Sequence, residues 1–139
     1  MAKTVSKIVG VLYVVAGIAG LVVGEDADRY HNLLHLVTGL IALYFGFAAS
    51  LSGATRFCLA FGVAYLAFGI LGIVMGNPAM DRMWDLGLIS VSMGDHVHHM
   101  VLGTVILAGG IITRVGGSQD RRSSIRHGQS STVSERQFL

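Results

Sequence analysis

Two short segments hold most of the histidines of this chain, and histidine is the residue here with the clearest capacity for chemistry. The five histidines are His31 and His35 in the first segment and His96, His98 and His99 in the second. Imidazole is a ligand of zinc, copper and nickel, and of haem iron. Asp95 precedes the second segment. Residues four apart share one face of a helix, as His31 does with His35 and Asp95 with His99.

The histidine cluster has three interpretations, which the sequence leaves open. In the first, the histidines are structural, and His35 and His99 hydrogen-bond across the helices to Tyr13, Tyr65 or backbone groups. In the second, the cluster binds a transition metal. In the third, His35 and His99 are axial ligands of a haem or a related tetrapyrrole. The candidate metal ligands are His31, His35, Asp95, His96, His98 and His99.

No catalytic motif accompanies the histidines in the sequence. The chain has no Gly-x-Ser-x-Gly elbow, no P-loop and no dinucleotide fingerprint, and its single cysteine, Cys58, cannot form a cysteine pair. We therefore expect a protein that is not an enzyme. Nucleic acid is excluded as a partner, because most of the arginines lie in a short tail rather than on a folded surface.

The apolar residues fall into four blocks, which predict the elements that position the histidines. The chain is 53% hydrophobic and 13% charged, whereas soluble domains carry about 25% charged residues. The fold class expected is all-α, an integral membrane four-helix bundle. The expected spans are about 5–24, 32–51, 56–76 and 95–115. The fourth must begin near Asp95, because its uninterrupted apolar run is shorter than the about 20 residues that cross a bilayer.

Charge placement predicts the orientation of these spans. Lysine and arginine accumulate on the cytoplasmic side of membrane proteins. Here they flank the N-terminus, the turn between the second and third spans, and the end of the fourth span, whereas the other two connections are acidic. We expect a bacterial inner membrane protein with both termini in the cytoplasm and a disordered tail over residues 116–139. The connection that contains Trp84 is expected to form a short interfacial helix.

The chain also contains an internal repeat of about two spans. The segment from Val9, VGVLYVVAGIAGLVVG, aligns with FGVAYLAFGILGIVMG from Phe61, and HLVTG from His35 aligns with HMVLG from His99. Two tandem two-helix repeats would be related by a pseudo-two-fold axis along the membrane normal. Glycine stripes let helices approach closely, although they would also leave a flat slot for a cofactor or lipid. The predicted packing glycines are Gly10, Gly17, Gly20, Gly39, Gly62, Gly69, Gly72 and Gly103.

The segments HNLLHLVTGLIAL (from His31) and DHVHHMVLGTVILAGG (from Asp95) are similar to motifs of a known family. The chain resembles the bacterial four-span membrane proteins of domain-of-unknown-function family 4383. The first motif, Asn-x-x-His-Leu-x-x-Gly, begins at Asn32, and the second, Asp-x-x-x-His-x-x-x-Gly, begins at Asp95. The resemblance covers about residues 5–115. It implies a fold and a site near His35 and His99, and it implies no activity.

These observations lead to three expectations for function. The first is a structural or accessory subunit of a larger membrane complex, whose partners are membrane lipids and other membrane protein subunits or a second copy of the chain. The alternative is a protein that binds haem, another tetrapyrrole or a transition metal through the histidines. A third class, an enzyme or transporter, would admit a quinone or lipid at the polar outer mouth of the bundle.

Overall fold

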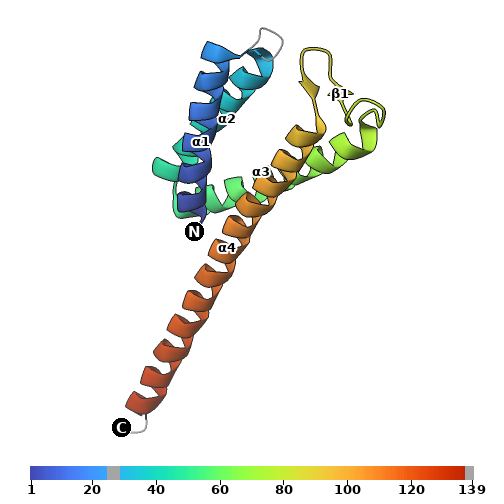
Figure 1. Ribbon diagram of the computed structural model, residues 1–139. Coiled ribbons are helices and arrows are strands. Elements are labelled where there is room, and N and C mark those ends of the chain that lie inside the picture. The colour runs from blue at the N-terminus through green and yellow to red at the C-terminus, as the bar shows by residue number, and fades with distance from the viewer. Residues whose placement is uncertain (25–28, 137–139) are drawn as a thin grey trace.

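The computed structural model describes residues 1–24 and 29–136, with side chains up to Gln119. Over these residues the protein is helical apart from one small β-hairpin (Figure 1). The helices are α1 (Ala2–Val23), α2 (Arg29–Phe47), α3 (Leu51–Met75) and α4 (Met93–Arg136). The strands β1 (Trp84–Asp85) and β2 (Ser90–Val91) lie between α3 and α4.

The helices form two hairpins, α1 with α2 and α3 with α4. Each hairpin packs far more extensively within itself than against the other hairpin. The two hairpins meet near the N-terminus and diverge toward the end that carries β1 and β2 (Figure 1). The molecule is therefore two tight helix pairs that are joined at one end.

Three helices of the described chain are long and apolar enough to cross a membrane. They are α1, α3 and the portion of α4 from Met93 to Gln119. The expectation of a helical protein of membrane type is confirmed at this level. α2 is the exception among the four predicted spans, since its first turns carry Arg29, His31, Asn32 and His35, which lower its mean hydropathy.

Glycines bring the two helices of each hairpin into backbone contact. A Cβ at Gly17 would lie 2.6 Å from the amide nitrogen of Leu36 on α2. A Cβ at Gly69 would lie 2.6 Å from the carbonyl oxygen of His96 on α4. Real Cβ atoms do not approach other atoms so closely, so any larger residue would force the helices apart.

The second helix of each hairpin also has glycines that contact the backbone of the first, so α2 approaches α1 and α4 approaches α3 in the same way. A Cβ at Gly39 would lie 2.6 Å from the Val14 amide nitrogen, and one at Gly103 would lie 2.5 Å from that of Leu66. The four remaining predicted glycines also face the partner helix of their own hairpin: Gly10 meets Leu43, Gly62 meets Leu107, Gly20 meets Asn32 and Gly72 meets His96.

A small buried core joins the two hairpins at the N-terminal end. Ala2 and Val9 of α1 pack with Cys58 of α3 and Ile106 of α4. The Ala2 amide donates a hydrogen bond to the Thr113 hydroxyl on α4, at 2.7 Å. The core side chains are mostly small, so α1 can lie close to both α3 and α4 here.

Aromatic rings hold α2 and α3 apart on the opposite side of the bundle. Phe45 of α2 stacks on Phe57 of α3 with ring centroids 4.5 Å apart. The stack continues along α3 through Phe61, at 5.0 Å, and Tyr65, at 4.5 Å. We call these four rings the ring column. A groove of about 640 Å³ lies beside it, lined also by Gly53 and Ala60.

The connection before α4 is a β-hairpin, and the expectation of an interfacial helix there was wrong. Trp84 pairs with Val91 and Asp85 with Ser90 in antiparallel register. The turn is closed by the Asp85 carboxylate, which accepts a hydrogen bond from the Gly87 amide at 2.8 Å. Gly87 has φ +87°, which glycine adopts without strain. Trp84 packs on the Phe68 ring of α3, 5.5 Å away.

α4 continues as a helix from Met93 to Arg136, through most of the segment expected to be a tail. It extends well past the level of the N-terminus (Figure 1). The segment contains no proline, so nothing in it removes a backbone donor from the helix. A Cβ at Gly116 or Gly117 would meet nothing within 4 Å, so the helix leaves the bundle at about this point.

Candidate functional site between the hairpins

The candidate site lies where the two hairpins begin to diverge, and two tyrosines mark its floor. Tyr13 of α1 and Tyr65 of α3 face each other with ring centroids 6.0 Å apart. Tyr13 is only 2% exposed. Because Tyr65 is also the last ring of the ring column, the site is continuous with the aromatic side of the bundle.

Each tyrosine is paired with a histidine from the partner helix of its own hairpin. The Tyr13 ring lies 4.9 Å from the His35 ring of α2. The Tyr65 ring also lies 4.9 Å from the His99 ring of α4. The two hairpins thus supply the same pair of side chains from corresponding positions, and the pairs meet in the middle of the molecule.

Two further histidines complete the cluster. His31 lies one turn before His35, with ring centroids 4.5 Å apart. His98 of α4 reaches across to the first hairpin, 5.9 Å from the Tyr13 ring and 6.4 Å from the His35 ring. The structure therefore brings together four of the six residues predicted as ligands.

Two polar atoms in the cluster are buried without a hydrogen-bond partner among the described residues. They are the Tyr13 hydroxyl and Nε2 of His35. By contrast, Nδ1 of His99 is hydrogen-bonded to the Asp95 carbonyl one turn earlier. Buried polar groups in proteins are almost always paired, and an unpaired one costs about 1–3 kcal/mol. The Tyr13–His35 pair therefore has unused hydrogen-bonding capacity.

Two cavities, each of about 270 Å³, flank this pair, and His35 lines both. We call the first the covered cavity, because the β-hairpin lies over it. It lies between α2, α3 and α4, and is lined by His31, His35, Thr38, Tyr65, Phe68, Ile89 and His99 among others. The second, the open cavity, lies between α1, α2 and α4 and is lined by Leu12, Tyr13, Ala16, His35, His98 and Leu102.

Asp95 and His96 serve the fold rather than the cluster. Asp95 Oδ2 accepts hydrogen bonds from the Ser92 amide, at 2.8 Å, and from its hydroxyl, at 2.9 Å, which caps the start of α4. His96 is fully buried against Gly72, and its Nε2 hydrogen-bonds with the Arg82 carbonyl oxygen at 2.9 Å. His96 therefore packs α3 on α4 as Asn32, which lies against Gly20, packs α1 on α2.

The metal interpretation receives no support from this geometry. Within the described part of the chain, no three histidine, cysteine, aspartate or glutamate residues are arranged to hold a metal ion. The tetrapyrrole interpretation is not supported either. Small-molecule sites measure about 300–1,000 Å³, and each cavity is about 270 Å³, too small for a macrocycle between His35 and His99.

Several residues of the site were missed at the level of sequence. Phe68 was interpreted only as part of an apolar span, yet it lines the covered cavity, and its ring centroid lies 5.0 Å from that of His99. The equivalence of Asn32 and His96 was also missed. A signal existed, because the offset of 64 residues that aligns His35 with His99 also aligns Asn32 with His96.

The helices and the histidine cluster define a helical protein of membrane type with a polar site between its hairpins. The chain belongs to the family described as domain of unknown function DUF4383, whose pattern matches residues 26–112. The match covers more than half of the chain and includes both histidine segments. Comparison with curated proteins and with solved structures finds no match.

Proposed function

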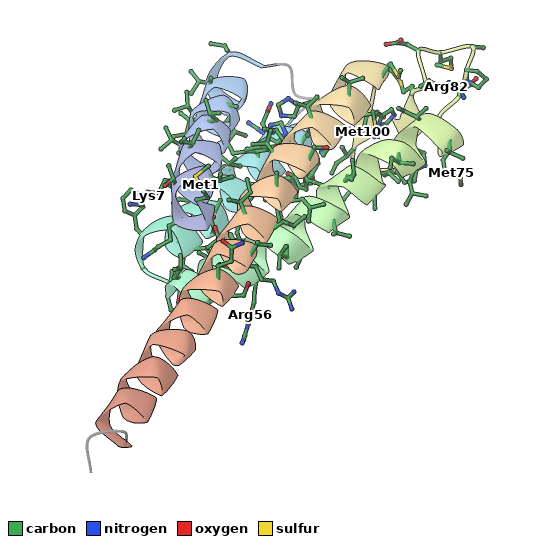
Figure 2. The ribbon with its side chains drawn as sticks, turned by 90° about the horizontal axis from the view of Figure 1, so that it is seen from below. Met1, Lys7, Arg56, Met75, Arg82 and Met100 are labelled. Carbon is green, nitrogen blue, oxygen red and sulfur yellow. The ribbon has the colours of Figure 1, made fainter. Side chains whose placement is uncertain are left out.

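We propose that all four helices cross a bacterial inner membrane and that both termini lie in the cytoplasm. If α1 and α3 span, α2 must return the chain between them. Its 19 residues give about 28 Å of helix, close to a hydrocarbon core of about 30 Å. The positive-inside rule supports the orientation, because Arg56 lies near the start of α3, whereas Asp81 and Asp85 follow its end. Figure 2 shows Arg56 at the end of α3 opposite Met75.

Labelling of introduced cysteines tests this topology. A Ser118→Cys variant is expected to react with an impermeant maleimide only when the cytoplasmic face is accessible. A Leu88→Cys variant is expected to react only from the other face. Native Cys58 is buried and gives little background. Labelling of both positions from the same side would contradict the four-span arrangement.

We also infer that the membrane part is two copies of one hairpin. The support is the set of matched contacts, in which Gly17 and Gly69 meet the partner helix in the same way and both Tyr–His pairs are separated by 4.9 Å. The site lies on the axis that would relate the copies. Each copy contributes one tyrosine and one histidine to it.

For this site we propose a binding function. The ligand is a small lipid-soluble molecule whose head group carries carbonyl or hydroxyl oxygens, and a quinone is the simplest class. The single observation that carries the proposal is the buried Tyr13 hydroxyl beside the buried Nε2 of His35, both unpartnered in the described structure. A carbonyl oxygen would accept the tyrosine hydrogen bond, and the imidazole can donate or accept according to its tautomer.

The surroundings of the pair fit an amphipathic ligand. Both cavities are lined mainly by apolar and aromatic side chains, so a ring could pack there while its oxygens reach Tyr13 or His35. Leu34 lines the covered cavity and Leu12 the open cavity, and both side chains are more than half exposed, so an apolar tail would reach the lipid past them. The size of each cavity fits a single ring better than a fused macrocycle.

The only tryptophan of the chain provides the test. Trp84 lies 5.5 Å from Phe68, which lines the covered cavity, so a quinone bound there is expected to quench its fluorescence. Decylubiquinone titrated into the purified protein in mild detergent should quench in a saturable way. His35→Phe should weaken this binding up to about tenfold, because it removes the unpartnered polar atom that lines the covered cavity.

Tyr44→Phe is the matched control, since Tyr44 is 60% exposed on α2 and lies outside both cavities. His35→Phe is also expected to raise the stability of the ligand-free protein, because it removes a buried unpaired ring nitrogen. An imidazole with a purely structural role would give the opposite pair of results. Quenching that does not saturate, or that is equal in the two phenylalanine variants, would refute the binding proposal.

A second candidate function is that of an accessory subunit, and the groove between α2 and α3 favours it. Ala60 and Ala64 lie one turn apart on the groove wall, a spacing that admits a neighbouring transmembrane helix. The occupant proposed is a helix of a membrane partner. Ala60→Leu with Ala64→Leu would fill the groove, and Ala108→Leu on the exposed face of α4 is the control.

Crosslinking in native membranes followed by size measurement in mild detergent tests this role. The wild-type protein and Ala108→Leu are expected to run in a larger assembly, and the groove-filled variant is expected to run alone. A wild-type protein that is monomeric without a co-purifying subunit would refute the accessory role. A larger species made only of this chain would indicate self-association.

A further inference from the structure

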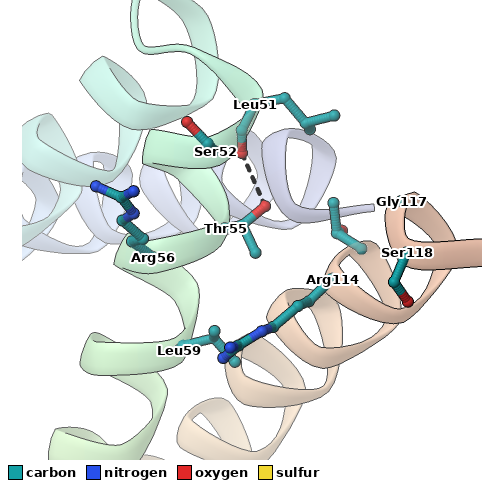
Figure 3. Close-up of a pocket in the computed structure, with 9 residues that line it drawn as sticks. Leu51, Ser52, Thr55, Arg56, Leu59, Arg114, Gly117 and Ser118 are labelled. Atoms are coloured by element: carbon teal, nitrogen blue, oxygen red, sulfur yellow. Dashed lines mark hydrogen bonds between the residues drawn. The ribbon is translucent and has the colours of Figure 1, made fainter. Parts of the chain in front are cut away.

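A further pocket, distinct from the groove and the two cavities described above, lies at the opposite end of the molecule from the histidine cluster. It lies between the first turns of α3 and the stretch of α4 that faces them, and its volume is about 650 Å³. Its lining includes Ser52 and Arg56 from α3 and Arg114 and Ser118 from α4 (Figure 3). Nothing in the proposed function of the histidine cluster uses this pocket.

The pocket carries two positive charges, one from each helix. Figure 3 shows the Arg114 side chain extending from α4 to Leu59 of α3, whereas the Arg56 side chain, one turn earlier on α3, points away from α4. The acidic side chains that the structure describes, Asp81, Asp85 and Asp95, lie toward the far end of α3 and the start of α4. Charge at this end is therefore complementary to an anion.

The pocket is also apolar where it faces the bundle surface. Leu51 and Leu59 line it beside the arginines, and Leu51 is 56% exposed. The start of α3 adds a weak positive field, because the N-terminus of a 25-residue helix carries a partial positive charge. A ligand that matches this pocket has an anionic head and an apolar chain that can follow α3 and α4 into the membrane.

We propose that this pocket binds the phosphate of an anionic phospholipid of the cytoplasmic leaflet. The leaflet follows from the orientation proposed above, which places the arginines inside. Basic pockets between transmembrane helices on this side of a membrane are suited to anionic head groups. The Arg114 guanidinium supplies charge-assisted hydrogen bonds to the phosphate, Arg56 adds a second positive charge at the same end of the molecule, and Leu59 contacts the first part of an acyl chain.

Lipid binding can be measured by native mass spectrometry of the purified chain with added phosphatidylglycerol or phosphatidylcholine. We expect the wild-type protein to retain phosphatidylglycerol preferentially. Because charge-assisted hydrogen bonds to the phosphate are lost together with both pocket charges, Arg56→Gln with Arg114→Gln should weaken phosphatidylglycerol binding about thirtyfold. Arg56→Lys with Arg114→Lys, which keeps both charges, should retain most of it.

Lys3→Gln with Lys7→Gln is the matched control. It removes the same charge from the same end of the molecule, but neither lysine lines the pocket. Its binding of phosphatidylglycerol is expected to stay within about twofold of wild type, because salt screens charges that do not contact the phosphate. An equal loss in the lysine control would show a general charge effect and would overturn the proposal, as would full binding by the double glutamine variant.

Two further measurements complete the test. Glycerol 3-phosphate should not displace the lipid, and efficient displacement would indicate a site for soluble phosphate compounds and contradict the lipid assignment. The glutamine variant should keep its helical circular dichroism and saturable decylubiquinone quenching of Trp84, which shows that it is folded. If neither the wild-type protein nor any variant binds the quinone, the proposed quinone site is refuted, whereas the comparison of lipid binding between the variants remains valid.

Discussion

The two hairpins are alike where they pack and different where they face the cavities. Gly17 meets the backbone of α2 as Gly69 meets that of α4, and each hairpin sets a tyrosine 4.9 Å from a histidine. The contacts that hold each helix pair together thus have counterparts in the other. Close glycine packing and a Tyr–His pair are therefore features that both hairpins have.

The cavity walls show the difference. Ala16 lines the open cavity at the position that corresponds to Phe68 in the covered cavity. Leu102 in the open cavity corresponds to Thr38 in the covered one. The covered cavity also has the β-hairpin over it. The two halves therefore present unequal surfaces to a ligand, and only one cavity is expected to bind it tightly.

The largest effect is expected at the glycines that the halves share. Gly17→Ala and Gly69→Ala should each lower the free energy of unfolding by about 3 kcal/mol, because the new Cβ overlaps backbone atoms that cannot move aside. Unfolding by SDS in mild detergent, followed by circular dichroism, measures this. Gly116→Ala, which meets no atom within 4 Å, should be neutral. Tolerance of one variant but not the other would show that the hairpins pack differently.

An exchange of cavity walls should have an intermediate effect. Phe68→Ala should destabilise the protein by about 2 kcal/mol, since Phe68 is half-buried and packs on Trp84 and His99. The Trp84 emission should shift to the red as water reaches it. Ala16→Phe should fill the open cavity and leave decylubiquinone quenching intact. Loss of quenching in Ala16→Phe would assign the ligand to the open cavity.

The smallest effect is expected where one half receives the residue of the other. His96→Asn gives the second hairpin the residue that packs the first, and it removes the hydrogen bond to the Arg82 carbonyl. The cost should be about 1 kcal/mol in thermal or SDS unfolding. Quinone binding should not change, because His96 lines neither cavity. A variant that folds but does not bind the quinone would return His96 to the site.

Much of the helical framework could be predicted from the sequence, because bilayer thickness and helix periodicity act on long runs of residues. The glycine stripes could be recognised for the same reason. The β-hairpin could not, because Leu86, Leu88 and Ile89 form an apolar cluster that suits an interfacial helix equally well. The turn depends on two residues, Asp85 and Gly87, whose local hydrogen bond decides the outcome.

The candidate site could be predicted only in part. Spacing places His35 and His99 on helix faces, but it does not say which histidines are taken up by packing. His96 lies against Gly72, and Asp95 is used to cap α4. The packing role of His96 depends on a contact between two different helices, α3 and α4. The capping role of Asp95 depends on the residue at which α4 begins, which composition does not define. A hydrogen bond between His35 and Tyr13 was one of the expectations, but the two residues meet only through their rings, and the Tyr13 hydroxyl and His35 Nε2 have no partner among the described residues.

The ring column has a thermodynamic consequence. Phe57 and Phe61 form one wall of the groove between α2 and α3, and Tyr65, the next ring along the column, forms part of the covered cavity. An occupant of the groove would therefore contact one end of the ring column, and an occupant of the covered cavity would contact the other end. By thermodynamic linkage, the factor by which a groove occupant changes the affinity of the cavity for its ligand equals the factor by which that ligand changes the affinity of the groove for its occupant.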